Sequence, residues 1–221
     1  VQHNPTPNGF QTGRGAAYES DLRDKKYGRV YRVLYRNTTE PSRTQSLEAA
    51  STKELVESLK NDNFFWRRTA QRLLVERNAN DVETLKQLID LTKNNNVDEI
   101  GLNAAAMHAL WTLQGLADNS PDNLEPRRAL AAACTNGFGH SSGPVRHAAV
   151  SVCSPELITK AFEANLHNDK DEKVKLALLL RVADGRSQGV SPDVLAALAV
   201  GVDSVVQDDI LLDAWTAASA T

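Results

Sequence analysis

The chain is poor in aromatic residues and in cysteine. Only 5% of its 221 residues are aromatic, and it has two cysteines. Alanine and leucine supply most of its hydrophobic content, and both favour helices, whereas aromatic and β-branched residues favour strands. Two cysteines do not form a disulfide framework in a chain of this length. No hydrophobic run approaches the roughly 18 residues of a membrane span. The composition therefore indicates a helical fold with no membrane-spanning helix.

The chain as a whole has no strong excess of positive or negative charge, but its two parts differ in net charge. The net charge is -3, which implies no strong attraction to nucleic acid or to an anionic membrane. Residues 1–45 have eight Lys and Arg against four Asp and Glu, whereas residues 46–221 have 17 against 24. This change in composition predicts two domains, 1–45 and 46–221.

The first 45 residues show no helical periodicity. Residues 1–27 are rich in Gly, Pro, Asn and Thr, and we expect an extended loop there. Residues 28–36 predict a strand, with Tyr31, Val33 and Tyr35 on one face. Residues 37–46 have the composition of a linker. Because the chain begins at Val1 and its one methionine is Met107, we expect it to be a piece of a longer protein.

From Ser46 onward the hydrophobic pattern is helical. Ser51-Thr52-Lys53-Glu54 has the sequence of a capping box, in which two side chains satisfy amides at a helix start. Ser154-Pro155 and Ser191-Pro192 also fit helix starts. Caps and periodicity together predict about ten helices. We expect them near residues 52–60, 64–77, 82–93, 98–117, 124–135, 144–153, 155–167, 172–184, 192–202 and 206–219.

The expected helices form pairs, and the second helix of each pair shares a sequence theme. A hydrophobic residue is followed by a cationic or polar residue, then by small residues and then by aliphatic ones. The clearest copies are Trp66-Arg67-Arg68-Thr69-Ala70, Val145-Arg146-His147-Ala148-Ala149 and Val174-Lys175-Leu176-Ala177-Leu178; weaker copies begin at Leu102 and Ile210. Their spacing matches the roughly 30–47 residues of two-helix repeats. The sequence predicts an all-α fold, an α-solenoid of about five helix pairs after an N-terminal extended or β segment.

Two parts of the chain resemble known families. The helical part is similar to the short HEAT-like repeats of phycobiliprotein-lyase-related proteins. The N-terminal part resembles the last portion of the β-propeller in large bacterial dehydrogenase-like proteins related to sugar and sorbosone dehydrogenases, in which HEAT-like repeats follow the propeller. The second resemblance rests on Val1-Gln2-His3-Asn4-Pro5-Thr6-Pro7, Phe10-Gln11-Thr12-Gly13-Arg14-Gly15 and Arg23-Asp24-Lys25-Lys26-Tyr27-Gly28-Arg29-Val30-Tyr31-Arg32-Val33.

The resemblance implies a bacterial, periplasmic or secreted parent, a quinone-dependent sugar dehydrogenase-like oxidoreductase with a propeller and a cytochrome c domain. This chain lacks most of the propeller and has no Cys-x-x-Cys-His sequence. The family's quinone and haem sites therefore have no counterpart among its residues. We expect a non-catalytic join between propeller and helical repeats, without cofactors of its own.

The residues that could carry chemistry are scattered. His3, His108, His140, His147 and His167 lack the spacing of a metal site. We expect Cys134 and Cys153 to be buried thiols on helices. The glycine-rich stretch 137–143 lacks the Gly-Lys-Ser/Thr ending of a phosphate loop, so we expect a flexible inter-helix loop. We accordingly predict no catalytic, cofactor or metal residue.

One stretch predicts an interaction surface. In Phe64-Phe65-Trp66-Arg67-Arg68, Trp66 belongs to the hydrophobic stripe of its helix, which leaves the two phenylalanines and the two arginines outside the core. We expect at least one of Phe64 and Phe65 to cover the strand or the linker, and we favour domain docking over binding of an external ligand. The candidate surface consists of Tyr31, Val33, Tyr35, Phe64, Phe65, Arg67 and Arg68.

Two functions from different classes follow from these features. The first is a non-catalytic scaffold or protein-interaction module that contacts other domains of the parent protein or a protein partner, with no nucleic acid and no membrane span. The alternative is a catalytic or nucleic-acid-binding HEAT-like domain, as in DNA glycosylases or bilin lyases. Because phosphate binding needs a basic stripe and the helical part has net charge -7, the sequence favours the first.

Overall fold

A computed structural model describes residues 46–185, 194, 198 and 205–220. Contacts between residues divide the chain into two units, Val1–Gln45 and Ser46–Thr221. The description that follows concerns the second unit. The expected strand at residues 28–36 lies outside the described residues, together with Tyr31, Val33 and Tyr35.

The described residues contain nine α-helices, two short 3-10 helices and no strand. The all-helical prediction for this unit is thus confirmed where the structure describes it. The elements are α2 (Thr52–Ser58), α3 (Phe64–Glu76), α4 (Val82–Lys93), α5 (Ala104–Asn119), α6 (Leu124–Phe138), α7 (Gly143–Val152), η1 (Pro155–Leu157), α8 (Ile158–Glu163), η2 (Leu166–Asn168), α9 (Glu172–Gly185) and α11 (Asp209–Ser219). In the expected range 192–202, Val194 and Leu198 are described, and both are helical and buried.

Most helices begin next to a residue whose short polar side chain accepts a hydrogen bond from a backbone amide of the first turn. Ser51 forms the predicted capping box with Glu54 at the start of α2. The Asp81 side chain caps α4 by accepting a hydrogen bond from the amide of Thr84. The Asp208 side chain caps α11 by accepting hydrogen bonds from the amides of Ile210 and Leu211. The same role is filled at α3, α5 and α6 by Asn63, Asn103 and Asn123. Such caps satisfy amides that have no partner within the helix.

Helix α5 begins six residues later than expected, because the preceding residues form a turn. The Oδ1 atom of Asp98 accepts the amides of Ile100 and Leu102, at 3.0 and 2.8 Å. Gly101 has φ +80°, a conformation that glycine adopts without steric cost. The helix therefore starts only at Ala104, after the cap Asn103. The expectation of one helix over 98–117 was wrong at its N-terminal end.

Two further expectations need correction. The range 155–167 is η1, α8 and η2 rather than one helix, and it is broken at Asn165, whose φ is +62°. The stretch 137–143 is not a flexible loop throughout, since Gly137 belongs to α6 and Gly143 to α7. The short connection between them contains His140 and Ser142, which are both buried.

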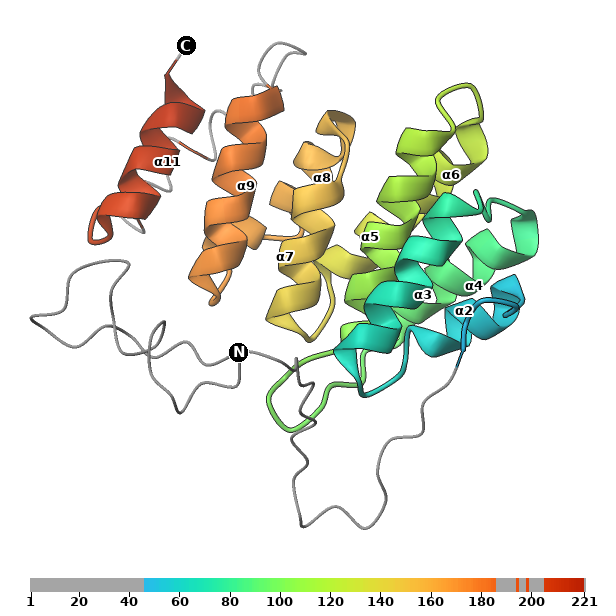
Figure 1. The fold of residues 1–221 in the computed structure, drawn as a ribbon. Helices are drawn as coiled ribbons and strands as arrows, with labels where there is room; N and C mark the ends of the chain where they lie inside the picture. Colours follow the sequence, from blue (N-terminus) through green and yellow to red (C-terminus); the bar gives the residue numbers. More distant parts are fainter. Residues whose placement is uncertain (1–45, 186–193, 195–197, 199–204, 221) are drawn as a thin grey trace, which may run out of the picture. The chain divides into compact units, whose positions relative to one another are not determined.

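The helices pack in chain order, and their substantial contacts join neighbours or next-but-one neighbours (Figure 1). One row is formed by α3, α5, α7, α9 and α11, each of which contacts the next. A second row is formed in the same way by α2, α4 and α6. Pairs α2–α3, α4–α5 and α6–α7 connect the two rows. Neighbouring helices are therefore packed into two rows within this unit.

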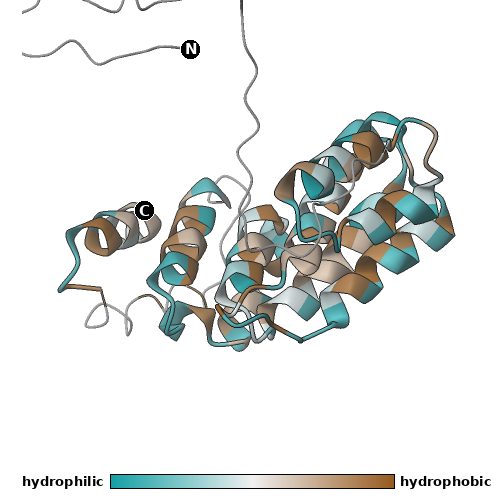
Figure 2. Cartoon of the chain, turned by 60° about the horizontal axis from the view of Figure 1, so that its bottom comes forward, coloured by the Kyte–Doolittle hydropathy of each residue, from teal (hydrophilic) through white to brown (hydrophobic). Residues whose placement is uncertain are grey.

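A hydrophobic core runs between the rows. Its fully buried side chains include one each from α2, α3, α5, α7 and α9, namely Leu55, Leu74, Leu110, Val145 and Leu178. Figure 2 shows hydrophobic residues on the facing sides of neighbouring helices and hydrophilic residues on the outer sides. Burying a leucine or valine contributes about 1.5–3 kcal/mol, so the stacking of neighbours supplies the stabilisation that no single pair provides.

The structure also corrects the register of the two weaker repeat copies. The clear copies begin at the third residue of α3, α7 and α9, which are Trp66, Val145 and Val174. The third residue of α5 is Ala106, not Leu102, and the third residue of α11 is Leu211, not Ile210. Ala106 and Leu211 are both buried, as are Val145 and Val174, whereas Trp66 is partly buried.

Candidate interaction surface

Arginines occupy the fourth position of both α3 and α7, and each binds the loop that precedes its helix. Arg146 Nη1 donates to the carbonyl oxygens of His140 and Ser141, at 2.8 and 3.1 Å. Arg67 Nη1 donates to the carbonyl oxygens of Asn61 and Asp62, at 2.6 and 2.8 Å. In both cases the acceptors lie six and five residues before the arginine, so the two side chains have the same local role.

The rest of the Arg146 guanidinium is satisfied by a carboxylate. Its Nε and Nη2 atoms donate to Asp169 Oδ2 and Oδ1, at 2.6 and 2.8 Å. The two side chains are only 9% and 5% exposed. Burial would raise the pKa of Asp169, but hydrogen bonds from Arg146 and the Asp171 amide, together with the Arg146 charge, bring it below its usual range. This bidentate pair ties α7 to the loop before α9.

Arg67 has no such partner. Its Nε atom is buried and makes no hydrogen bond. Within the described residues, no carboxylate lies within 4.0 Å of its guanidinium. Half of the hydrogen-bonding capacity that Arg146 uses is therefore unfilled at Arg67.

An exposed aromatic ring lies beside this guanidinium. Phe64 and Phe65 are 58% and 61% exposed, high values for phenylalanine. The Arg67 Cζ atom lies 5.8 Å from the centroid of the Phe64 ring, within the range of a cation–π contact. The Phe65 ring packs edge-on against Trp66 at 4.9 Å, and Trp66 in turn packs against the core.

Helix α5 extends the aromatic surface. The His108 ring lies 6.0 Å from the Phe64 ring, and Trp111, one turn later and 41% exposed, follows on α5. His108 Nδ1 is 2.6 Å from Gln71 Oε1. Burial and the positive charge of Arg67 lower the His108 pKa to about 4, so its ring is neutral at pH 7.

The charge of α3 is unlike that of the unit around it. It carries Arg67, Arg68 and Arg72 against the single acid Glu76, the largest cationic excess among the described helices. Arg72 is paired with Glu76 at 3.4 Å. Arg68 is exposed and makes no ion pair with a described residue. The start of α3 is therefore cationic as well as aromatic.

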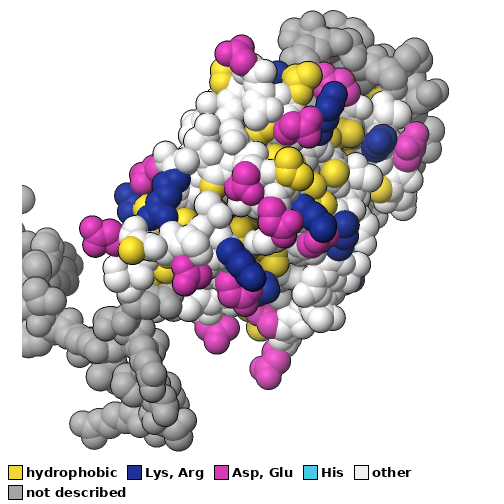
Figure 3. Space-filling view, turned by 90° about the vertical axis from the view of Figure 1, so that its right-hand side faces the viewer, with side chains coloured by type: hydrophobic (Ala, Val, Ile, Leu, Met, Phe, Trp, Pro, Cys, Tyr) yellow, Lys and Arg dark blue, Asp and Glu magenta, His cyan; other side chains and the backbone are white. Residues whose placement is uncertain are grey.

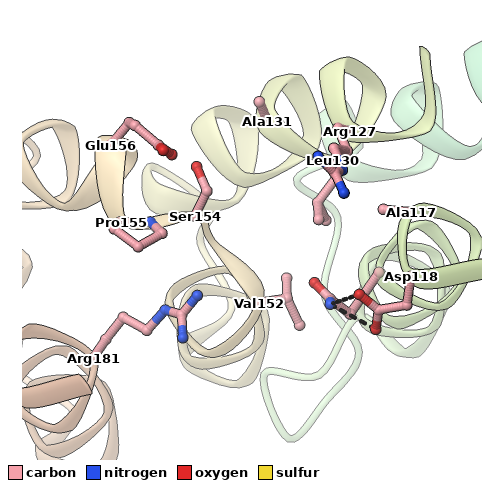
Figure 4. Close-up of a pocket in the computed structure, with 11 residues that line it drawn as sticks. Ala117, Asp118, Arg127, Leu130, Ala131, Val152, Ser154, Pro155, Glu156 and Arg181 are labelled. Carbon is pink, nitrogen blue, oxygen red and sulfur yellow. Dashed lines mark hydrogen bonds between the residues drawn. The ribbon is translucent and has the colours of Figure 1, made fainter. Parts of the chain in front are cut away.

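A cavity of about 340 Å³ lies among α5, α6, α7, η1 and α9 (Figure 4). Its charged lining is balanced, with Asp118 and Glu156 against Arg127 and Arg181. Three of these groups already have partners within the chain. Arg181 Nε donates to the Cys153 carbonyl at 2.8 Å, Gln114 donates to Asp118, and hydrogen bonding, chiefly from Ser154, lowers the Glu156 pKa. The cavity offers no unsatisfied acid–base pair.

Two grooves lie along the row formed by α2, α4 and α6. One, between α2 and α4, has a volume of about 660 Å³, and the other, between α4 and α6, about 420 Å³. Figure 3 faces the right-hand side of Figure 1, where α2 and α4 lie, and shows cationic and anionic side chains interspersed with hydrophobic ones. This alternation of charge is typical of a solvated surface, and it favours no ligand of one sign.

Neither metal nor thiol chemistry is indicated in the part of the chain that the structure describes. There, no group of three or more His, Cys, Asp and Glu is arranged to hold a metal ion. Cys134 and Cys153 are buried free thiols, as predicted, and burial raises the pKa of both. Cys134 lies in α6, whereas Cys153 follows the last residue of α7 and is not helical. No helix in the described ranges combines the length and hydrophobicity that a membrane crossing requires.

Of the seven predicted surface residues, the structure brings four together. Phe64, Phe65, Arg67 and Arg68 lie in the first turns of α3, whereas the three strand residues fall outside the description. The sequence did not identify His108 as a neighbour of Phe64, because that proximity depends on the packing of α3 against α5, which the sequence alone does not show. No protein-family model, curated protein or solved structure matches this chain.

Proposed function

We propose that this chain is a non-catalytic scaffold and protein-interaction module, built as an α-solenoid of about five HEAT-like, armadillo-like helix pairs. The observation that carries the proposal is the exposed aromatic pair Phe64 and Phe65 beside Arg67 and Arg68 on α3. Aromatic residues and arginine are the side chains that contribute most to protein interfaces.

Packing in chain order supports the solenoid half of the proposal. In a solenoid each repeat contacts only its neighbours, and the rows α3–α5–α7–α9–α11 and α2–α4–α6 have this property. The close approach of the helices depends on small residues. A Cβ atom on Gly115 would lie 2.8 Å from Val75 Cγ2, so α3 and α5 touch almost directly.

The proposed partner is another domain of the parent protein or a separate protein. The N-terminal resemblance would make this chain the join between the propeller and the helical repeats of a bacterial, periplasmic or secreted dehydrogenase-like protein. The predicted strand at residues 28–36 presents Tyr31, Val33 and Tyr35 on one face. An uncovered strand with such a face would recruit another chain, so docking on Phe64 and Phe65 would protect it.

Hydrogen–deuterium exchange on the full chain tests the proposal. We compare the wild type with a double variant, Phe64→Ser and Phe65→Ser. The matched control is Val82→Ser with Ile100→Ser, two residues that are 78% and 84% exposed. Covering two aromatic side chains contributes about 1.5–3 kcal/mol each, so amides in residues 28–36 should exchange at least tenfold faster in the double variant.

The control should leave the exchange of residues 28–36 unchanged. If these amides exchange at the same rate in all three proteins, the α3 surface does not dock the strand, and the proposal fails in this form.

A further inference from the structure

We infer that the α3 surface binds an acidic protein segment, and that Nε and Nη2 of Arg67 hold a carboxylate of that segment. The inference rests on the proposed function and adds the chemistry of the partner. The site consists of Arg67, the adjacent ring of Phe64, the His108 ring beside Phe64, and the exposed Phe65 on the same helix.

Arg146 shows what an arginine at this helix position does when a carboxylate is present. One nitrogen, Nη1, holds the carbonyl oxygens of the preceding loop, while Nε and Nη2 form two parallel hydrogen bonds to Asp169. The guanidinium is planar, so one edge serves the loop and the other edge serves the acid.

Arg67 repeats the first half of this arrangement and lacks the second. Asp169 stands two residues before Asp171, whose side chain accepts the amide of Lys173 at the start of α9. The corresponding residue before α5, two positions ahead of the cap Asn103, is Gly101, which has no side chain to offer. The loop before α3 therefore holds the Arg67 guanidinium in place, and no acid among the described residues fills its second edge.

An unfilled buried donor favours a ligand that can fill it. Nε of Arg67 is buried without an acceptor, and such a donor loses its bond to water without replacement. Because Nε has no solvent contact, an incoming carboxylate must displace its cover. Phe64, whose ring lies 5.8 Å from the Arg67 Cζ atom, is 58% exposed, so its side chain has room to move.

The surroundings indicate what accompanies the carboxylate. The exposed rings of Phe64 and Phe65 suit hydrophobic side chains next to the acid, and Arg68 adds a second exposed cation. Helix α3 has an excess of cations within a unit of net charge -7, so it attracts an acidic segment locally. Residues 28–36 contain no Asp or Glu, so the predicted strand cannot supply this carboxylate.

Two measurements on the full chain test the inference. The probe is a blocked hexapeptide of alternating Asp and Leu, and its matched control replaces every Asp by Asn. Titration is followed by the NMR signal of the Arg67 Nε–H group, assigned with Arg67→Lys, and by fluorescence anisotropy of the labelled peptide. We expect a saturable shift of the Arg67 signal with the acidic peptide and none with its Asn counterpart.

Arg67→Lys keeps the charge but loses the planar fork, so binding should weaken about tenfold. The matched control is Arg72→Lys on the same helix, which should bind the acidic peptide with an affinity within about twofold of that of the wild type. The wild-type NMR titration remains decisive even if Arg67→Lys disturbs the loop before α3.

Three results would overturn the inference: an Arg67 signal that does not move, equal binding of the two peptides, or equal binding by wild type and Arg67→Lys. Tighter, Arg67-dependent binding of a 12-nucleotide oligothymidylate would assign the surface to nucleic acid instead. The predicted strand has no acid and would compete with the acidic segment for Phe64 and Phe65, so the exchange experiment tests the strand as occupant of this surface, and the peptide titration tests the acidic segment.

Discussion

The Arg146–Asp169 pair is the most buried ion pair among the described residues, and its loss should be costly. Asp169→Asn leaves a buried arginine without its counter-charge, which typically destabilises a protein by about 3–5 kcal/mol. Urea unfolding at pH 7 measures the loss. The control is Glu125→Gln, which breaks an exposed pair with Arg128 at 2.7 Å and should cost at most about 1 kcal/mol.

The cost of Asp169→Asn should depend on pH. The folded-state pKa of Asp169 is lowered, so its stabilisation is fully present above the ordinary aspartate pKa of about 3.9 and is lost as pH falls through the folded value. Wild type and variant should therefore differ equally at pH 7 and 5 and converge towards pH 3. A difference that stays constant down to pH 3 would contradict this assignment.

His108 should make the protein sensitive to mild acid. Its folded pKa of about 4 lies below the usual 6.5, so the folded state binds fewer protons than the unfolded state between these values. Its contribution to stability is complete above pH 6.5 and falls as pH drops towards 4, by at most about 1.4 kcal/mol per pH unit. His108→Gln should flatten the pH dependence of the unfolding free energy between pH 6.5 and 4. An unchanged slope would show that His108 is not the source of this dependence.

Some of the residues that matter for the surface and the loops could be predicted from the sequence, and others could not, for a physical reason. Phe64, Phe65, Arg67 and Arg68 could be chosen because they lie outside a helical stripe. Asp169 and His140 could not, because their roles depend on contacts with Arg146 and Asn94 across separate turns. Periodicity contains no information about which loops meet.

Among the helices, the approach of α6 and α7 depends on one glycine. A Cβ atom on Gly137 would lie 2.6 Å from Ala149 Cβ, a distance that forces the helices apart. Gly137→Ala should destabilise the protein by about 1–3 kcal/mol despite the better helix propensity of alanine. The matched control is Gly139→Ala, whose Cβ would meet nothing within 4 Å. Thermal unfolding compares the two, and equal melting temperatures would show that α6 and α7 have room to adjust.

The helices themselves were largely predictable, and their ends less so. The range 82–93 is α4 as expected, and α3 ends one residue before its predicted limit. The error at α5 came from Asp98, whose side chain accepts amides within a turn. A polar residue before a hydrophobic run can cap a helix or build a turn, and its local sequence alone does not distinguish these roles.

For the helical unit as a whole, pairing could be predicted because the repeat theme sets which face each helix buries. Trp66, Val145 and Val174 mark equivalent positions, and the structure extends the series to Ala106 and Leu211. The weak copies were misplaced because small or aliphatic residues occur at several adjacent positions. The sequence could not show that Arg67 lacks an acid, because that depends on which residue faces it from the next repeat.

The central claim is that this unit is a one-dimensional repeat scaffold, and local unfolding tests it most directly. Leu211 is buried in α11, whose substantial contacts in the described part are with α9. Leu211→Ala should cost about 2–5 kcal/mol at that site. Hydrogen–deuterium exchange of the full chain should then speed up in α9 and α11 and stay unchanged in α2, α3 and α4. An equal increase in exchange across all helices would show a single compact bundle and contradict the scaffold.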